Sequence, residues 1–218
     1  MNSDDFVFEL DGRVRNALAR IGSLSMEAEP GEGIGIPELL KLALKSELEA
    51  TEIAAFWLLS EHDVEVKLTL ARQCGDEAKH YKLILARLEQ LDVDVTGFDP
   101  LAGGTSPMVG FLQGLQTTVE RVACGPFARE GLARVRNQIF LEYCEERGDD
   151  ETAKLYRDII QPDEGHHHEL GRTLLLRLAN TEAEQDRARK AVTRTLELAE
   201  ELQEMARMKR GIARAPGC

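Results

Sequence analysis

Two short stretches of this sequence repeat the same residue types at the same spacing. Residues 76–80 are DEAKH and residues 163–167 are DEGHH, so each stretch is Asp-Glu-x-x-His. On an α-helix, residues three apart lie on the same face, and a Glu and a His at this spacing can ligate one metal ion together. Oxygen and imidazole ligands suit iron or manganese better than copper or a zinc–thiolate site. The two candidate pairs are Glu77 with His80 and Glu164 with His167.

Apolar residues around both pairs predict that the pairs face the protein core. The apolar stripes comprise Leu70, Cys74, Ile84 and Leu88 around the first pair, and Ile160, Gly171, Leu174 and Leu178 around the second. Charged groups on a core-facing stripe cost free energy unless something compensates them. A bound metal ion would supply that compensation.

Each pair also has a candidate partner carboxylate on the helix that precedes it. Residues at equal height on an antiparallel helical hairpin lie equally far along the chain from its turn. The midpoint between Glu47 and Glu77 is position 62, inside the predicted turn SEHD. The midpoint between Glu130 and Glu164 is position 147, in the predicted turn RGDD. Both hairpins therefore bring a glutamate level with the glutamate of the motif.

Other carboxylates fit this geometry less well. Pairing Glu120 with Glu164 would put the turn at position 142, inside a helical pattern. Glu49 points about 200° around the helix from Glu47, at roughly 100° per residue. Glu52 is also less well placed than Glu47.

Six helices are predicted to position these residues. They cover about 6–23, 37–59, the segment from the turn at 60–63 to 91, 108–146, 151–179 and 182–209. A loop is expected at 23–35, and Ser60 is expected to cap the next helix, with Asp63 three residues on. The segment 92–107, rich in Gly, Pro and Asp, is long enough to cross over a bundle. Gly125-Pro126 and Pro162 should kink their helices, because proline lacks a backbone donor.

The fold class is therefore all-α, with no convincing strand. The predicted organisation is an N-terminal segment and loop at 1–36, a helical bundle at 37–180, and a C-terminal helix with a basic tail at 181–218, in the same domain as the bundle. A chain of 218 residues is long enough to bury a sizeable hydrophobic core.

Composition narrows the possible partners and the location. The formal net charge is −12, which argues against general nucleic-acid binding. No apolar run is long enough to span a membrane, and no secretory signal is visible, so a cytoplasmic location is expected. The four cysteines lack CxxC spacing and are expected to be reduced thiols. The one basic segment is predicted to be a solvated helix end; its cations are Arg207, Lys209, Arg210 and Arg214.

Together, the two motifs and the two partner carboxylates resemble the ligand set of the ferritin-like superfamily, over roughly residues 37–180. In that superfamily, two helices each supply a Glu and two others each supply Glu-x-x-His. The resemblance implies a four-helix bundle with a long crossover between its second and third helices. It implies two iron ions, or alternatively manganese or a mixed Mn/Fe pair. The implied ligands are Glu47, Glu77, His80, Glu130, Glu164 and His167.

The resemblance also suggests supporting residues and roles. Asp76 and Asp163 would orient the ligating imidazoles from behind, and His168 would lie beside the site. Glu130 and Glu164 would be the mobile or bridging carboxylates, with Glu47 and Glu77 completing the set. His80 and His167 would each cap one metal, whereas His62 and His166 are expected to be exposed.

The implied function is a di-iron or di-manganese oxidoreductase that activates O2 or peroxide and oxidises or hydroxylates a small organic substrate. The alternative is a ferroxidase that handles iron without an organic substrate. A homodimer or small homo-oligomer is expected. Tyr81, Tyr143 and Tyr156 are expected to be packing residues, because Ile84 occupies the position of the radical tyrosine of reductase subunits. Arg134 replaces the hydroxyl residue that monooxygenases often carry. A tRNA-modifying hydroxylase and a metal-free helical scaffold are the other two hypotheses.

Overall fold

The computed structural model describes residues 1–27, 34–212 and 214–217, and every regular element within these ranges is helical. The prediction of an all-α protein is confirmed for this part of the chain. The α-helices are α1 (Ser3–Glu27), α2 (Ile36–Ser60), α3 (Val64–Gln90), α4 (Pro107–Gln113), α5 (Thr118–Val122), α6 (Glu130–Glu146), α7 (Asp150–Leu155), α8 (Gln161–Leu178) and α9 (Glu182–Arg210). Two π-helical segments, η1 (Ala123–Arg129) and η2 (Tyr156–Ile160), lie between α5 and α6 and between α7 and α8.

The hairpin of α2 and α3 forms around the predicted turn, but with a different cap. Asp63 is the N-cap of α3, and its side chain accepts a hydrogen bond from the Val66 N–H. Ser60, the predicted cap, instead ends α2 and donates to the Trp57 carbonyl. The carboxylate of Asp63 satisfies an orphan donor of the first turn and favours the positive end of the helix dipole.

The helix predicted over 108–146 is broken into several pieces, which corrects the prediction. Helix α4 ends at Gln113, and α5 begins after a reciprocal cap. The Thr117 side chain accepts from the Glu120 N–H, while the Glu120 carboxylate accepts from the Thr117 N–H. This capping box fixes a new helix start and uses the carboxylate of Glu120, one of the rival ligands.

The two predicted kinks are realised as π segments, each just before a candidate ligand. Pro126 lies inside η1, which ends directly before Glu130. Pro162 lies in the first turn of α8, directly after η2 and two residues before Glu164. A π segment inserts an extra residue into the helical turn and rotates the side chains that follow it. The register of both glutamates therefore depends on these segments.

Gly171 on α8 lets this helix lie directly against η1. A Cβ atom at Gly171 would lie 2.6 Å from the Phe127 nitrogen and 2.6 Å from the Pro126 carbonyl carbon, and these backbone atoms cannot turn aside. Gly75 on α3 is also inside a helix, but nothing lies within 4 Å of its Cβ position.

We therefore expect opposite effects of alanine at the two glycines. Gly171→Ala should destabilise the metal-free protein by about 1–3 kcal/mol through overpacking. Gly75→Ala should stabilise it by about 0.5–1 kcal/mol, because glycine is the weaker helix former. Urea unfolding measures both. Equal effects of the two substitutions would show that the close contact between α8 and η1 is absent.

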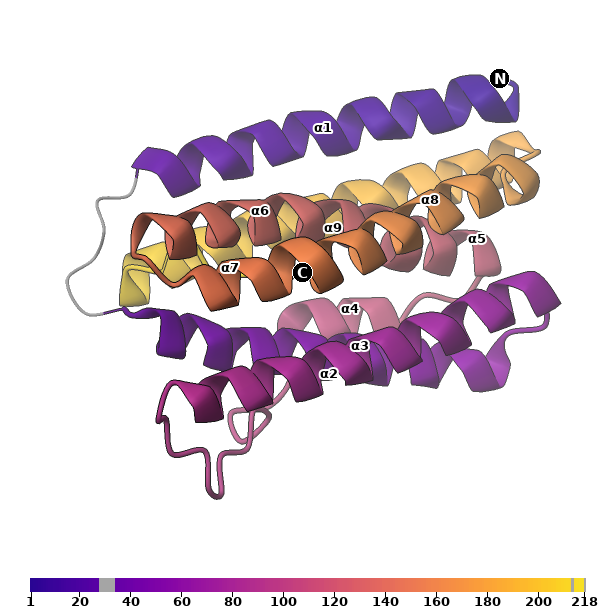
Figure 1. Ribbon diagram of the computed structural model, residues 1–218. Helices are drawn as coiled ribbons and strands as arrows, with labels where there is room; N and C mark the ends of the chain where they lie inside the picture. The colour runs from indigo at the N-terminus through magenta and orange to yellow at the C-terminus, as the bar shows by residue number, and fades with distance from the viewer. Residues whose placement is uncertain (28–33, 213, 218) are drawn as a thin grey trace.

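The helices form a layered arrangement in which the hairpin of α2 and α3 and the helix α1 lie on opposite sides of α6, α8 and α9 (Figure 1). Helix α1 is longer than predicted and buries one apolar face in the same core cluster as α8 and α9. The buried residues of this face are Phe6, Val7, Leu10, Val14, Ala17 and Ile21. No helix of the described residues is both long enough and apolar enough to cross a membrane.

The C-terminal tail packs on the bundle, contrary to the predicted solvated end. Gly211, at φ +63°, ends α9 in the left-handed conformation. The Arg214 guanidinium lies 5.3 Å from the Tyr143 ring centre and 3.3 Å from the Glu146 carboxylate, and the Gly217 N–H donates to Asn137 Oδ1. The side chains of Lys209 and Arg210 lie outside the described residues. Cys74, Cys124 and Cys144 are free thiols, and Cys218 is not among the described residues.

Candidate metal centre

The six residues predicted as ligands lie together inside the bundle, and each is at most 3% exposed. They come from four helices: Glu47 from α2, Glu77 and His80 from α3, Glu130 from α6, and Glu164 and His167 from α8. Carboxylates are rarely buried without compensation. Four of them in one buried cluster therefore need a chemical explanation.

The six side chains form two overlapping groups of donor atoms. In each group one atom from every residue lies within 4.8 Å of the others. The first group is Glu47, Glu77, His80 and Glu164, and the second is Glu77, Glu130, Glu164 and His167. Both groups could hold a metal ion, and they share Glu77 and Glu164.

The two shared glutamates divide their oxygen atoms between the two imidazoles. His80 Nδ1 lies 3.3 Å from Glu77 Oε2 and 3.8 Å from Glu164 Oε1. His167 Nδ1 lies 3.8 Å from Glu77 Oε1 and 4.0 Å from Glu164 Oε2. Each carboxylate thus turns one oxygen toward each group, which is the disposition of a bridging ligand.

This arrangement differs from the predicted roles of Glu130 and Glu77. The predicted bridging carboxylates were Glu130 and Glu164, but Glu130 belongs to one group alone, with Oε2 3.6 Å from His167 Nδ1. Glu47 belongs only to the other group, 3.5 Å from His80 Nδ1. The reason is that the two motifs face each other across the bundle, so that both motif glutamates are central.

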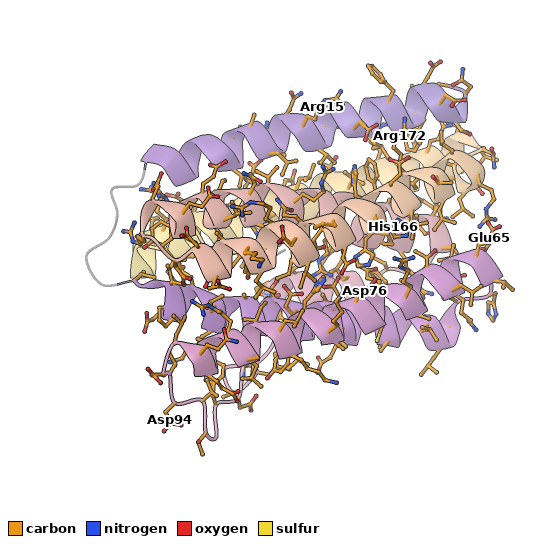
Figure 2. All side chains as sticks on the ribbon, in the orientation of Figure 1. Arg15, Glu65, Asp76, Asp94, His166 and Arg172 are labelled. Atoms are coloured by element: carbon orange, nitrogen blue, oxygen red, sulfur yellow. The ribbon has the colours of Figure 1, made fainter. Side chains whose placement is uncertain are left out.

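Asp76 and Asp163 hold the imidazoles crosswise, each contacting the histidine of the other motif. Asp76 Oδ2 lies 3.0 Å from His167 Nε2, and Asp163 Oδ2 lies 3.1 Å from His80 Nε2. A ring nitrogen facing a carboxylate carries the proton, which leaves Nδ1 as the side turned to the cluster. The Lys79 ammonium, 2.7 Å from Asp163, supports this carboxylate from outside. Asp76 is visible beside α3 in Figure 2.

His168 belongs to neither donor group, which corrects the prediction that it lies beside the site. Its Nδ1 lies 2.7 Å from the Phe127 carbonyl in η1, and its ring stacks on Phe127 with the centres 5.0 Å apart. His168 therefore supports the π segment and does not contact the cluster. His62 and His166 are both exposed, as predicted, and neither belongs to a donor group; His166 is labelled in Figure 2.

Gln73 contacts the cluster and was not predicted. Its side chain is 3% exposed, and its Nε2 donates to Glu130 Oε1. This bond holds Glu130 with its other oxygen, Oε2, toward His167. The position of Gln73, one turn before Glu77 on the same face of α3, was visible in the sequence. A glutamine at that spacing is common on helices, however, and does not by itself predict a contact with a carboxylate of another helix.

The electrostatics of the cluster favour protons or cations among its carboxylates. Burial, and then the neighbouring Glu130 carboxylate, raises the pKa of Glu77 to about 8. Burial and the charges of Glu130 and Glu77 raise the pKa of Glu164 well above its usual range. Burial alone would raise the pKa of Glu130, but Glu164 and His167 outweigh it, and the pKa is lowered.

The pKa values of the two imidazoles are also raised, which favours their positively charged forms. Burial alone would lower the pKa of both rings. The carboxylates of Glu47 and Glu77 instead raise the pKa of His80 to about 11, and those of Glu130 and Glu77 raise the pKa of His167 to about 9. Without metal, His80, His167 and Glu77 therefore favour their protonated forms at neutral pH, and the pKa of Glu164 is shifted in the same direction.

Three buried atoms of the cluster have no hydrogen-bond partner among the described residues: Glu130 Oε2, Glu164 Oε2 and His167 Nδ1. All three belong to the second donor group. Unpaired buried polar atoms are rare and mark a missing water or ion. Two carboxylate oxygens and an imidazole nitrogen are suitable ligands for a divalent metal ion, so the residues present fit one.

Comparisons of the chain with protein-family models, with curated proteins and with solved structures found no match.

Proposed function

We propose that this protein holds two iron or manganese ions between Glu77 and Glu164 and is an oxidoreductase that acts on O2 or peroxide. The observation that carries the proposal is the orientation of the Glu77 and Glu164 carboxylates. Each of them has one oxygen near His80 and the other oxygen near His167. Four carboxylates also balance the charge of two divalent ions. The motif resemblance to the ferritin-like superfamily supports the same conclusion, since α2–α3 and α6–α8 supply two hairpins and the chain between them would be the crossover.

Each residue of the cluster would have a distinct role. Glu47 and His80 would complete one metal position, and Glu130 and His167 the other. Asp163 and Asp76 accept the Nε2–H of the two imidazoles and so keep each Nδ1 lone pair turned inward. Gln73 donates to one oxygen of Glu130, so that only the other oxygen faces the cluster. Two ferrous ions held by these residues could supply two electrons together to O2 or peroxide.

The test is to mix the anaerobic ferrous protein with O2 or peroxide in a stopped-flow spectrometer. We expect iron oxidation faster than that of free ferrous ion, and loss of this advantage in Glu77→Ala. Oxidation no faster than in buffer would contradict the proposed activity. If the ferric product instead accumulates far beyond two ions per chain, the protein handles iron as a ferroxidase.

The crosswise contacts make a separate prediction about the aspartates. Removing the carboxylate behind a ligating histidine typically weakens metal binding by about 10–100-fold. In a Glu130→Ala background, which should keep only the position with His80, Asp163→Asn is expected to cause this loss and Asp76→Asn is not. Titration with Mn2+, followed by electron paramagnetic resonance of the free ion, measures both. If Asp76→Asn weakens metal binding and Asp163→Asn does not, each aspartate orients the histidine of its own motif.

A further inference from the structure

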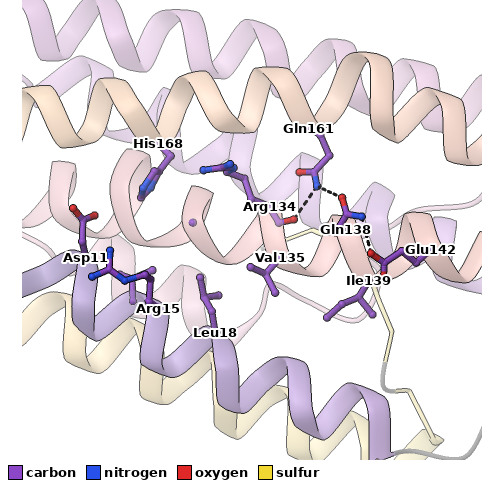
Figure 3. A pocket seen from close by; sticks show the side chains of 12 residues that line it. Asp11, Arg15, Leu18, Arg134, Val135, Gln138, Ile139, Glu142, Gln161 and His168 are labelled. Atoms are coloured by element: carbon purple, nitrogen blue, oxygen red, sulfur yellow. Dashed lines mark hydrogen bonds between the residues drawn. The ribbon is translucent and has the colours of Figure 1, made fainter. Parts of the chain in front are cut away.

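A second candidate site lies on the opposite side of α6 and α8 from the metal centre. It is a groove of about 710 Å³ between α1, α6 and α8, and none of the six cluster residues lines it (Figure 3). This volume lies within the range of small-molecule sites. The groove does not depend on whether the cluster binds metal.

The groove has an apolar surface formed by two helices. Val14 and Leu18 come from α1, and Val135 and Ile139 come from α6. Gly131 keeps one end open, since a Cβ atom there would lie 3.1 Å from Val14 and 3.5 Å from the His168 ring. An apolar body of a ligand could lie along these side chains.

One end of the groove is cationic. Arg134 extends toward His168, and the guanidinium of Arg15 lies beside Asp11 (Figure 3); within the described residues neither guanidinium makes a hydrogen bond or an ion pair. The Arg15 guanidinium lies 5.8 Å from the centre of the Phe8 ring.

In the part of the chain that the structure describes, the acids of the groove form no ion pair with these two cations. Asp11 is engaged by Arg172 Nε at 3.3 Å. Glu142 lies at the other end of the groove and accepts from Gln138 Nε2 at 2.7 Å (Figure 3). Because the Nδ1–H of His168 donates to the Phe127 carbonyl, its Nε2 is the acceptor side of the ring, and the two guanidinium groups are the donors left for a carboxylate. The cationic end therefore has free donors.

We propose that this groove binds a small amphipathic carboxylate, with its acid group at Arg15 and Arg134 and its apolar body against Val14, Leu18, Val135 and Ile139. Guanidinium groups match the geometry of a carboxylate and are weakly hydrated, which makes them its preferred partners. This proposal goes beyond the proposed metal chemistry, and it depends only on the residues that line the groove.

Calorimetric titration of the metal-free protein with octanoate tests the proposal. We expect saturable binding at one site, and binding of 1-octanol and octylamine at least about tenfold weaker, because neither carries a carboxylate. The double variant Arg15→Gln/Arg134→Gln should weaken octanoate binding by about tenfold or more. Val135→Trp, which fills the groove, should abolish it.

The matched control is Arg13→Gln/Arg194→Gln, which removes the same charge outside the groove. Arg13 pairs with Glu9 and Arg194 with Glu201, each at 2.9 Å. This control should change octanoate affinity less than about twofold. No saturable octanoate binding at millimolar concentration, equal binding of 1-octanol, or an equal loss in the control would each overturn the proposal. If Val135→Trp does not fold, the two arginine double variants decide.

Discussion

Replacing Glu77 or Glu164 with alanine is expected to remove both metal ions, whereas replacing Glu47 or Glu130 is expected to remove only one. The reason is that Glu77 and Glu164 belong to both donor groups, and the other two glutamates belong to one each. Metal analysis after equilibrium dialysis should give about two ions per chain for the unaltered protein, about one for the second pair of variants and close to none for the first.

Glu49 offers a control on the same helix as Glu47. It is 6% exposed and accepts from the Ser106 N–H and hydroxyl, both at 2.7 Å, so that it ties α2 to the start of α4. Glu49→Ala should lower stability but keep both ions. The same metal content in all four cluster variants would contradict the sharing of Glu77 and Glu164, and loss of metal in Glu49→Ala would indicate general unfolding.

A second large effect is expected in the pH dependence of metal binding. His80, His167 and Glu77, whose pKa values lie above 7 in the metal-free cluster, must release protons when metal binds. We expect about three protons released per two divalent ions at pH 7, and a metal affinity that rises with pH. Titration with Mn2+ in weak buffers of different ionisation enthalpy measures the number released.

The stability of the metal-free protein should change in the opposite direction with pH. The pKa values of His80 (about 11) and His167 (about 9) are raised above that of a free histidine, 6.5, and the pKa of Glu77 (about 8) is raised above 4.5. The folded state therefore binds more protons than the unfolded state, and stability falls as pH rises.

The same pKa values give the pH range over which this stability is lost. The contribution of Glu77 is present below pH 4.5 and is lost as the pH rises through about 8, and that of His167 is present below 6.5 and is lost through about 9. Urea unfolding of the metal-free protein between pH 6 and 9 should show this decline, and Glu77→Gln/His167→Gln should make it less steep, leaving the part that is due to His80. Stability that rises over this window would contradict the proton-filled cluster.

Much of the candidate site could be predicted because its geometry is local. A Glu-x-x-His pair fixes two side chains on one helical face, and a tight hairpin fixes which residue of the previous helix lies at the same height. Both constraints act within about 35 residues along the chain. They were sufficient to select Glu47 over Glu49 and Glu130 over Glu120, all of which the structure places as expected relative to the cluster.

What could not be predicted depends on contacts between the two hairpins. The crosswise bonds of Asp76 and Asp163, and the central position of Glu77, follow from how α3 faces α8. The rotation that the π segments impose is likewise a tertiary effect, because the close packing of Gly171 on η1 is invisible in local patterns.

The packing of α1 and of the tail was underestimated for a similar reason. Helix α1 was predicted as part of an N-terminal segment, and its buried face became evident only with α8 and α9 beside it. Arg214 was assigned to solvent from its charge, although an arginine can stack on an aromatic ring and pair with a carboxylate at once, as it does with Tyr143 and Glu146.

Anomalous diffraction from crystals grown with Mn2+ tests the central claim most directly. Two peaks about 3.5–4 Å apart, both within coordination distance of Glu77 and Glu164, are the predicted result. Peaks found only at surface carboxylates, with the six buried side chains unaltered and empty, would contradict it.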